Sequence, residues 1–233
     1  MSAFFETIGS IVTAMIDKWP MLWEGVVDTL YMTVMSSLAA YVIGLPLAIL
    51  LVLTSPKGLM PRPILYRVLD VVINIFRSVP FLILMILVIP VTKAIAGKSY
   101  GSTATIVPLT IAAAPYVARM IESSLLEVDA GTIEAAQSMG ASIPRIVFRV
   151  LLPEAKTSLL VGATICIGTI LGYSAMSGAI GGGGLGQIAI RYGYNRYQTD
   201  VLFASVILLV VMMQIFQIVG MFISRKTDKR NRE

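Results

Sequence analysis

Few residues in this chain could carry out covalent or metal chemistry. The sequence has no histidine, which excludes a catalytic triad or a zinc site that depends on imidazole. Its one cysteine, Cys166, lies in an apolar run, so no intrachain disulfide can form. Ala96-Gly97-Lys98-Ser99 ends like a nucleotide-binding P-loop, but that motif needs a glycine where this chain has Thr92. We therefore predict no catalytic residue, no bound cofactor and no metal site.

The stretch from Ile133 to Pro153, IEAAQSMGASIPRIVFRVLLP, is unusual for its polarity in a mostly apolar chain. Small side chains gather in its first part, and they would allow a partner surface to approach closely. They are Ala135, Ala136, Gly140 and Ala141, next to the charged Glu134. From these residues alone, the stretch could be a contact surface for a partner or an ordinary connector.

Local signals predict two short helices in and around this stretch. Asp129 or Thr132 can cap a helix that starts near Ile133, because either side chain can accept a bond from a free backbone N–H. Gly140 tolerates the left-handed backbone that commonly ends a helix. Pro144 can open the next helix, where its missing N–H does no harm. The first helix would be about two turns long.

The rest of the chain has the composition of an all-α integral membrane protein. It is 57% hydrophobic and only 13% charged, against roughly 25% charged in ordinary soluble domains. Five segments are apolar enough to cross a bilayer as helices, although Pro108 and Pro115 are expected to break the third, short one. The predicted spans are 26–53, 71–91, 103–117, 159–178 and 201–223.

The distribution of Lys and Arg predicts the orientation of these spans. Twelve of the eighteen fall on the side that holds the C-terminus and residues 132–153, and five fall on the other side. The positive-inside rule therefore places the C-terminus in the cytoplasm and the N-terminus outside. The net charge of +5 is explained by topology in a lipid membrane, so we expect no nucleic-acid partner.

The two ends of the chain have their own patterns. Apolar residues recur every three to four positions from Phe4 to Trp19, which predicts an amphipathic helix over residues 1–25 that lies in the outer interface. Residues 26–223 would form the transmembrane domain, with the polar segment 132–153 inside it. Residues 224–233 would form a basic cytoplasmic tail.

The polar stretch resembles the EAA motif of ATP-binding-cassette (ABC) importer permeases. The matching residues are Glu134-Ala135-Ala136, Gly140 and Leu152-Pro153, with a mild departure at Val150, where the family usually has Ile. Three longer stretches resemble the methionine-permease branch of that family: VNIFRSVPF, IVPLTIAAAPYVARM and GYSAMSGAIGGGGLGQI.

This resemblance implies a permease subunit that moves methionine into the cytoplasm by alternating access in the bacterial inner membrane. Its implied partners are a second copy of the chain, two cytosolic ABC ATPase subunits that hold the ATP, and a lipid-anchored methionine-binding protein outside. The short helix would be the coupling helix that docks on the ATPase. The implied coupling residues are Glu134, Ala135, Ala136, Gly140 and Ala141.

A second group of residues is predicted to line a translocation path or gate. An alternative for Arg77 is a structural role, in which it reaches the membrane surface and pairs with a carboxylate such as Glu122. For the residues that end the fourth span, the alternative is ordinary packing. The group is Arg77, Ser78, Pro80, Pro115, Tyr173, Ser174, Met176 and Gly181.

Three other functions remain open at this point. The same machinery could carry another amino acid, since specificity would rest largely with the binding protein. An ion-coupled secondary transporter is disfavoured because the fourth and fifth spans hold no acidic residue or histidine and no inverted repeat is evident. A membrane scaffold that transports nothing is the third.

Overall fold

In a computed structural model, the protein is described at residues 9, 13 and 15–227, and these residues form helices without any strand. The chain divides into two compact units. Unit 1 contains residues 15–38, 80–111 and 167–216, together with residues 9 and 13, and unit 2 contains residues 39–79, 112–166 and 217–227. About half of the predicted amphipathic helix over 1–25, namely residues 1–8, 10–12 and 14, falls outside the described residues, as do residues 228–233 of the predicted tail over 224–233.

Among the described residues, four helices are long and apolar enough to cross a membrane. They are α2 (Trp19–Thr54), α6 (Ser102–Leu126), α10 (Lys156–Ser177) and α12 (Thr199–Thr227). A fifth candidate is the pair formed by α3 (Pro63–Ser78) and α4 (Phe81–Leu87), which are separated by a short break. This all-helical set agrees with the predicted five-helix membrane protein.

Several boundaries differ from the sequence-based prediction. α2 begins at Trp19 rather than at residue 26, and α3 begins at Pro63 rather than at residue 71. The largest error concerns the third span, because α6 runs unbroken through Pro108 and Pro115 to Leu126. The fixed φ angle of proline suits a helix, so each proline costs a backbone hydrogen bond without ending the helix here.

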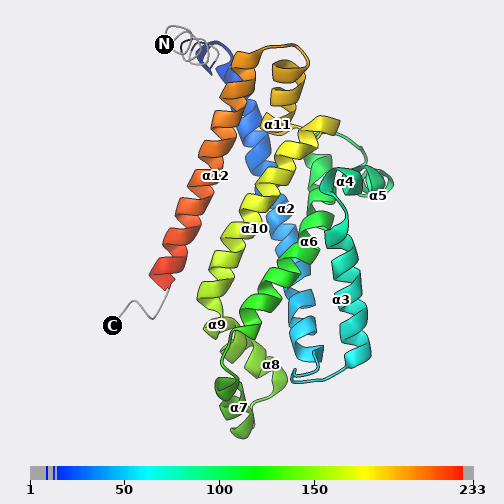
Figure 1. Ribbon diagram of the computed structural model, residues 1–233, viewed down its shortest axis with the longest axis vertical. Helices are drawn as coiled ribbons and strands as arrows, with labels where there is room; N and C mark the ends of the chain where they lie inside the picture. The colour runs from blue at the N-terminus through cyan, green and yellow to red at the C-terminus, as the bar shows by residue number, and fades with distance from the viewer. Residues whose placement is uncertain (1–8, 10–12, 14, 228–233) are drawn as a thin grey trace. The chain divides into compact units, whose positions relative to one another are not determined.

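Short elements connect the long ones (Figure 1). In unit 1 they are α5 (Ile89–Ala96), the 3₁₀ turn η2 (Gly178–Ile180), α11 (Gly184–Ile188) and the π-helix η3 (Ala189–Tyr194). In unit 2 they are α7 (Ala130–Ser138), α8 (Ile143–Ile146), the π-helix η1 (Val147–Leu151) and α9 (Leu152–Glu154).

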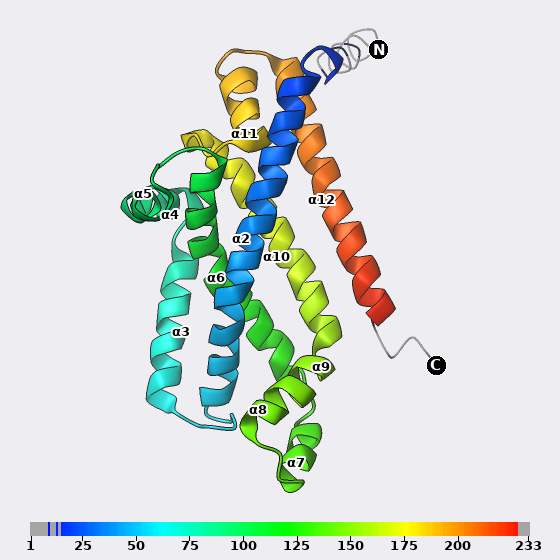
Figure 2. The same cartoon turned by 180° about the vertical axis from the view of Figure 1, so that it is seen from behind.

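The core of unit 1 joins α2, α10, α11 and α12. Figure 2 shows α11 beside the first turns of α2. A Cβ atom on Gly25 of α2 would lie 2.5 Å from Ile188 Cδ1, so glycine allows this close approach. The buried members of the core are Leu22, Val26, Leu171, Leu185, Ala204 and Met212.

In unit 2, α2 packs closely on α6, and α12 packs on α10. Gly44 faces Val117 and Ala114, whereas Gly220 faces the side chain of Thr164. In the most apolar 18-residue stretch of α12, only 6% of the residues are buried. An apolar helix with so little protein contact fits a lipid environment.

Candidate functional site

The predicted coupling helix is present as α7, and its start is fixed by Asp129. The Asp129 carboxylate accepts a hydrogen bond from the backbone N–H of Thr132 at 3.2 Å. This bond satisfies one of the free N–H groups of the first turn, and the negative charge suits the positive end of the helix. The helix therefore begins at Ala130, three residues before the predicted start at Ile133.

The end of α7 is a complete Schellman motif built around Gly140. Gly140 has a φ angle of +75°, in the left-handed region that favours glycine. Its N–H donates to the Gln137 carbonyl at 2.9 Å, and the N–H of Ala141 donates to the Ala136 carbonyl at 3.1 Å. These two bonds define the motif and hold the chain in a sharp turn after the helix.

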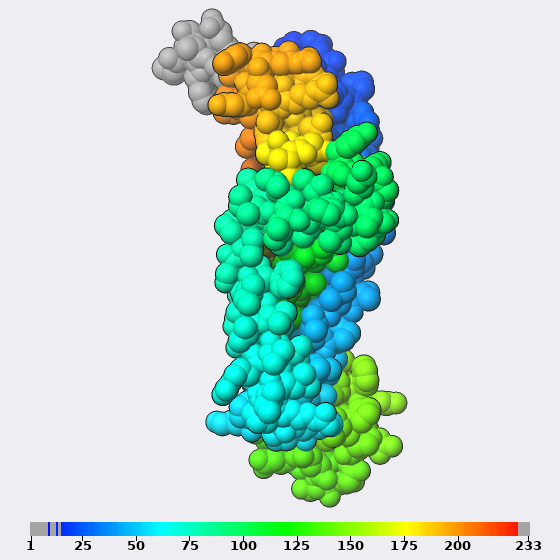
Figure 3. All heavy atoms as spheres, turned by 90° about the vertical axis from the view of Figure 1, so that its right-hand side faces the viewer, coloured from blue at the N-terminus to red at the C-terminus, as the bar shows by residue number. Residues whose placement is uncertain are grey.

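The side chains of α7 divide into a buried and an exposed set. Ala136 is buried, and Ala141 is partly buried. Glu134, Ala135 and Gly140 are exposed, and Met139 is 81% exposed. In Figure 3 the segment from α7 to α9 forms a lobe that protrudes beyond the surface of α3. Three of the five predicted coupling residues are thus free to meet another protein.

The lobe is attached to α10 through a second short helical run. Pro144 lies in the first turn of α8, as predicted. Ile146, Val147 and Leu151 are all buried, and η1 and α9 continue the run to α10. The segment from α8 to α10 is therefore a nearly continuous helical run with buried side chains along it.

The predicted path residues of unit 2 are Arg77, Ser78 and Pro115. Arg77 is exposed near the end of α3, and the Ser78 hydroxyl donates to the Asn74 carbonyl at 2.7 Å. After Ser78 the backbone of Val79 becomes extended, as expected before a proline, and α3 ends there. Pro115 is buried within α6.

The remaining path residues lie in unit 1. Pro80 precedes α4, where Phe81 stacks on Tyr173 with ring centroids 4.6 Å apart. Ser174 is buried and donates to the Leu171 carbonyl at 2.7 Å, so its hydroxyl is occupied by its own helix. Met176 is 51% exposed. Sequence reasoning missed the Phe81 partner, because no local signal pairs it with Tyr173.

Gly181 lies in a glycine-rich turn that is fixed by hydrogen bonds. It has a φ angle of +81°, and its carbonyl accepts a bond from the N–H of Gly101 at 2.9 Å. The Thr105 hydroxyl donates to the neighbouring Gly182 carbonyl at 3.0 Å. The turn is therefore tied to the first turn of α6.

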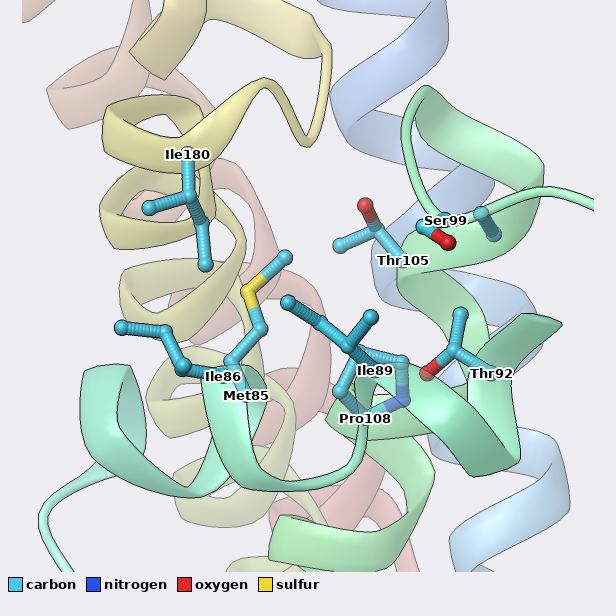
Figure 4. A pocket seen from close by; sticks show the side chains of 9 residues that line it. Met85, Ile86, Ile89, Thr92, Ser99, Thr105, Pro108 and Ile180 are labelled. Carbon is cyan, nitrogen blue, oxygen red and sulfur yellow. The ribbon is translucent and has the colours of Figure 1, made fainter.

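Beside this turn is a small, mainly apolar cavity of about 70 Å³. Figure 4 shows Met85 and Ile86 of α4, Thr105 and Pro108 of α6, and Ile180 around it. A water molecule takes up about 30 Å³ in the liquid, so a space of this size holds only a few of them. This cavity is therefore better described as a packing gap beside the turn than as a binding site for cargo.

An ion cluster in unit 2 corrects the suggested partner of Arg77. Glu122, which is buried, pairs with Arg119 at 2.7 Å and not with Arg77. The other guanidinium nitrogen of Arg119 pairs with Asp70 of α3 and also reaches the Asn74 side chain at 3.3 Å. Both Arg119 and Glu122 lie in the part of α6 beyond residue 117, where the third span is predicted to end.

Comparison with known proteins places the chain in a family. Residues 40–233 match the family described as "Binding-protein-dependent transport system inner membrane component". The chain belongs to this family. A Vibrio cholerae relative named "Probable D-methionine transport system permease protein MetI" is 50% identical to this permease over 203 residues, covering 87% of this chain and 90% of the relative.

Two further comparisons agree with that match. The Escherichia coli K12 "D-methionine transport system permease protein MetI" is 49% identical over 162 residues, covering 68% of the permease and 75% of the relative. A solved structure of the "MetNI methionine ABC transporter" in inward-facing conformations has a TM-score of 0.88 and 47% identity. It covers 90% of the permease and 99% of the matched chain. The sequence-based identification as an importer permease of this branch is confirmed.

Proposed function

We propose that this permease moves methionine into the cytoplasm by alternating access at the interface of a homodimer. The supporting observation is the close match, over nearly the whole chain, to MetI relatives and to a chain of the MetNI methionine transporter. The permease is a transport subunit in the inner membrane, and ATP hydrolysis belongs to separate ATPase chains. Two such cytosolic subunits, a second permease copy and an extracytoplasmic methionine-binding lipoprotein would complete the importer.

In this proposal the exposed face of α7 docks on the ATPase. The segment has what such a role needs: a helix fixed at both ends, exposed small residues and a packed connection to α10. When the ATPases close on ATP, α7 would move as a unit and carry α10 with it. The residues predicted to line the path, such as Tyr173 and Met176, would then change their access to the two sides of the membrane.

Uptake into vesicles tests the function directly. The permease would be reconstituted with its ATPase and binding protein, and labelled methionine uptake would be measured with and without internal ATP. We expect uptake only with ATP on the ATPase side and only with the binding protein present. Uptake without ATP under an imposed ion gradient would support the secondary-transporter alternative. No flux at all, with the ATPase still bound, would support a scaffold.

The same assay settles the choice of cargo. Unlabelled amino acids would be tested one by one as competitors of methionine uptake. We expect methionine to compete most strongly. Stronger competition by another amino acid would assign the machinery to that cargo and leave the importer mechanism unchanged.

The orientation follows from the charge count and can be tested by labelling. Since Cys166 is fully buried, Cys166→Ala gives a background without native thiols, into which Gln137→Cys or Lys98→Cys is introduced. A membrane-impermeant maleimide added outside should label position 98 and should reach position 137 only after the membrane is opened. The reverse pattern would place the N-terminus in the cytoplasm.

A further inference from the structure

A polar pocket in unit 1 is not used by the coupling segment or by the predicted path residues. Its volume is about 210 Å³, three times that of the apolar cavity beside the glycine-rich turn. It lies between the first turns of α2 and the run from the glycine-rich turn to η3, at the end that the charge count places outside. Its principal lining side chains are Met21, Glu24, Asp28, Gln187, Ile188 and Arg191.

The walls of this pocket are held in place by hydrogen bonds, one of them buried. The N–H of Leu185 donates to the buried Thr29 hydroxyl at 2.9 Å, which joins α11 to α2. The N–H of Gly183 donates to the Gln187 side-chain oxygen at 2.7 Å. Arg191 comes from a π-helix, a rare element that is frequent at functional sites. The pocket is thus a formed feature of unit 1.

The pocket contains both signs of charge, and the charges do not neutralise each other directly. Glu24 and Asp28 are four residues apart on α2 and therefore lie on one face of that helix. Among the described residues, neither carboxylate lies within ion-pair distance of Arg191. The Arg191 guanidinium lies 5.7 Å from the ring centroid of Tyr192, another lining residue.

This arrangement selects a class of ligand. An ammonium group has three N–H donors, which two carboxylates and the Gln187 amide oxygen can accept. A guanidinium binds a carboxylate through two parallel hydrogen bonds. A metal cation would meet the positive charge of Arg191, and a simple anion would meet both carboxylates. Met21 and Ile188 offer apolar contact to a short side chain.

We propose that this pocket binds a free α-amino acid as a zwitterion, with its ammonium at Glu24 and Asp28 and its carboxylate at Arg191. It would receive the cargo on the outer side before the cargo enters the translocation path. The choice of an amino acid as ligand rests on the proposed function, whereas the requirement for both charges rests on the pocket itself.

Equilibrium binding to the purified full-length permease tests this proposal. Labelled methionine is the probe, and N-acetylmethionine and methioninamide are competitors that lack the ammonium and the carboxylate, respectively. The pocket variants are Arg191→Gln and the double variant Glu24→Gln/Asp28→Asn. Lys93→Gln and Glu127→Gln remove exposed charges elsewhere and serve as matched controls. We expect at least tenfold weaker binding in both pocket variants and unchanged binding in the controls.

The competitors show whether each charge acts on the predicted group. In the double variant, the preference for methionine over N-acetylmethionine should shrink while the preference over methioninamide is kept. In Arg191→Gln, the preference for methionine over methioninamide should shrink while the preference over N-acetylmethionine is kept. A general loss of structure would reduce both preferences equally in both variants, and that result would overturn the proposal.

Three other results would also overturn it. The first two are wild-type affinity in both pocket variants and no saturable methionine binding to the wild-type permease. The third is a loss of methionine binding in the pocket variants that is seen only when the binding protein is added. The last would make the pocket a protein contact. The uptake assay separates this inference from the proposed function. If wild-type vesicles import methionine while the binding results are negative, only the pocket assignment fails. If they import none, the proposed function fails.

Discussion

Gly140, which follows α7 in unit 2, and Gly186, which lies within α11 in unit 1, place different demands on the chain. Gly140 has a φ angle of +75°, yet a Cβ atom there would meet nothing within 4 Å. Gly186 has no positive φ angle, but a Cβ atom there would collide with the backbone of Ala175. One glycine is needed for its conformation and the other for its lack of volume.

This difference fits the two places. The turn at Gly140 faces open space, as expected of a surface that another protein binds. The same close approach is seen just after α10, since a Cβ atom on Gly178 would lie 2.2 Å from the backbone of both Gly186 and Gln187. Unit 1 is therefore closed by direct contact of main chains, which leaves no room for even one methyl group.

The largest effect is expected for Gly186→Ala. The new methyl group meets backbone atoms, which cannot move aside as the end of a side chain can, and overpacking of this kind costs about 3 kcal/mol. The buried Cys166 offers a readout, because a thiol-reactive dye labels it only on unfolding. We expect a lower unfolding temperature or no folded protein. A wild-type unfolding temperature would show that the crossing is looser than described.

A smaller effect is expected for Gly140→Ala. An L-residue with a side chain pays about 1–2 kcal/mol in the left-handed region. Gly140→Asn should recover much of that loss, because asparagine tolerates this conformation better than alanine does. The same dye assay measures the loss of stability in Gly140→Ala and in Gly140→Asn. Equal losses in the two variants would mean that space, and not backbone conformation, limits position 140.

The sequence predicted the first of these glycines and not the second, and the reason is physical. The end of α7 depends on residues within one turn of each other, and so does its cap at Asp129. The role of Gly186 depends on Ala175 and on the path of the chain between them. The Asp70–Arg119 pair likewise joins residues that are far apart in sequence. The Arg119–Glu122 pair is local, three residues apart, and was missed because the third span was predicted to end at residue 117.

The transmembrane helices show the same distinction between features set by the local sequence and features set by packing. Long apolar runs such as α12 were located from composition, which needs no knowledge of packing. The continuity of α6 was missed because Pro108 and Pro115 were interpreted by their local cost alone. The end of α3 before Pro80 was also missed, because residues 71–91 were predicted as one span, although a proline restricts the residue that precedes it.

A third, still smaller effect is expected for Asp129→Ala. It removes the cap that accepts the Thr132 N–H and should cost about 0.5–1 kcal/mol on this exposed helix. Asp129→Asn keeps the acceptor oxygen and serves as the control. If both variants unfold at the wild-type temperature, water replaces the cap without cost. If the unfolding temperature falls by the same amount in both variants, the negative charge of Asp129 stabilises the helix and the hydrogen bond does not.

The smallest effect on stability, and a large one on transport, is expected for Ala135→Trp. Ala135 is exposed, so a larger side chain there should change stability by no more than about 0.5 kcal/mol. The bulk would instead keep the docking face of α7 away from the ATPase. Gly140 is less suitable for this test, because a bulky residue there combines backbone strain with the docking defect. We expect ATP-driven methionine uptake to fall at least tenfold while the unfolding temperature stays at the wild-type value.

Glu127→Trp adds the same bulk at an exposed position just before α7 and should leave uptake unchanged. The pair of variants thus separates docking from a general effect of an added tryptophan. Wild-type uptake in Ala135→Trp would remove α7 from the docking interface. Equal uptake losses in both variants would widen that interface to the residues before the helix. A fall in unfolding temperature as large as that of Gly140→Ala would instead make Ala135 a residue of the lobe's own packing, which its exposure argues against.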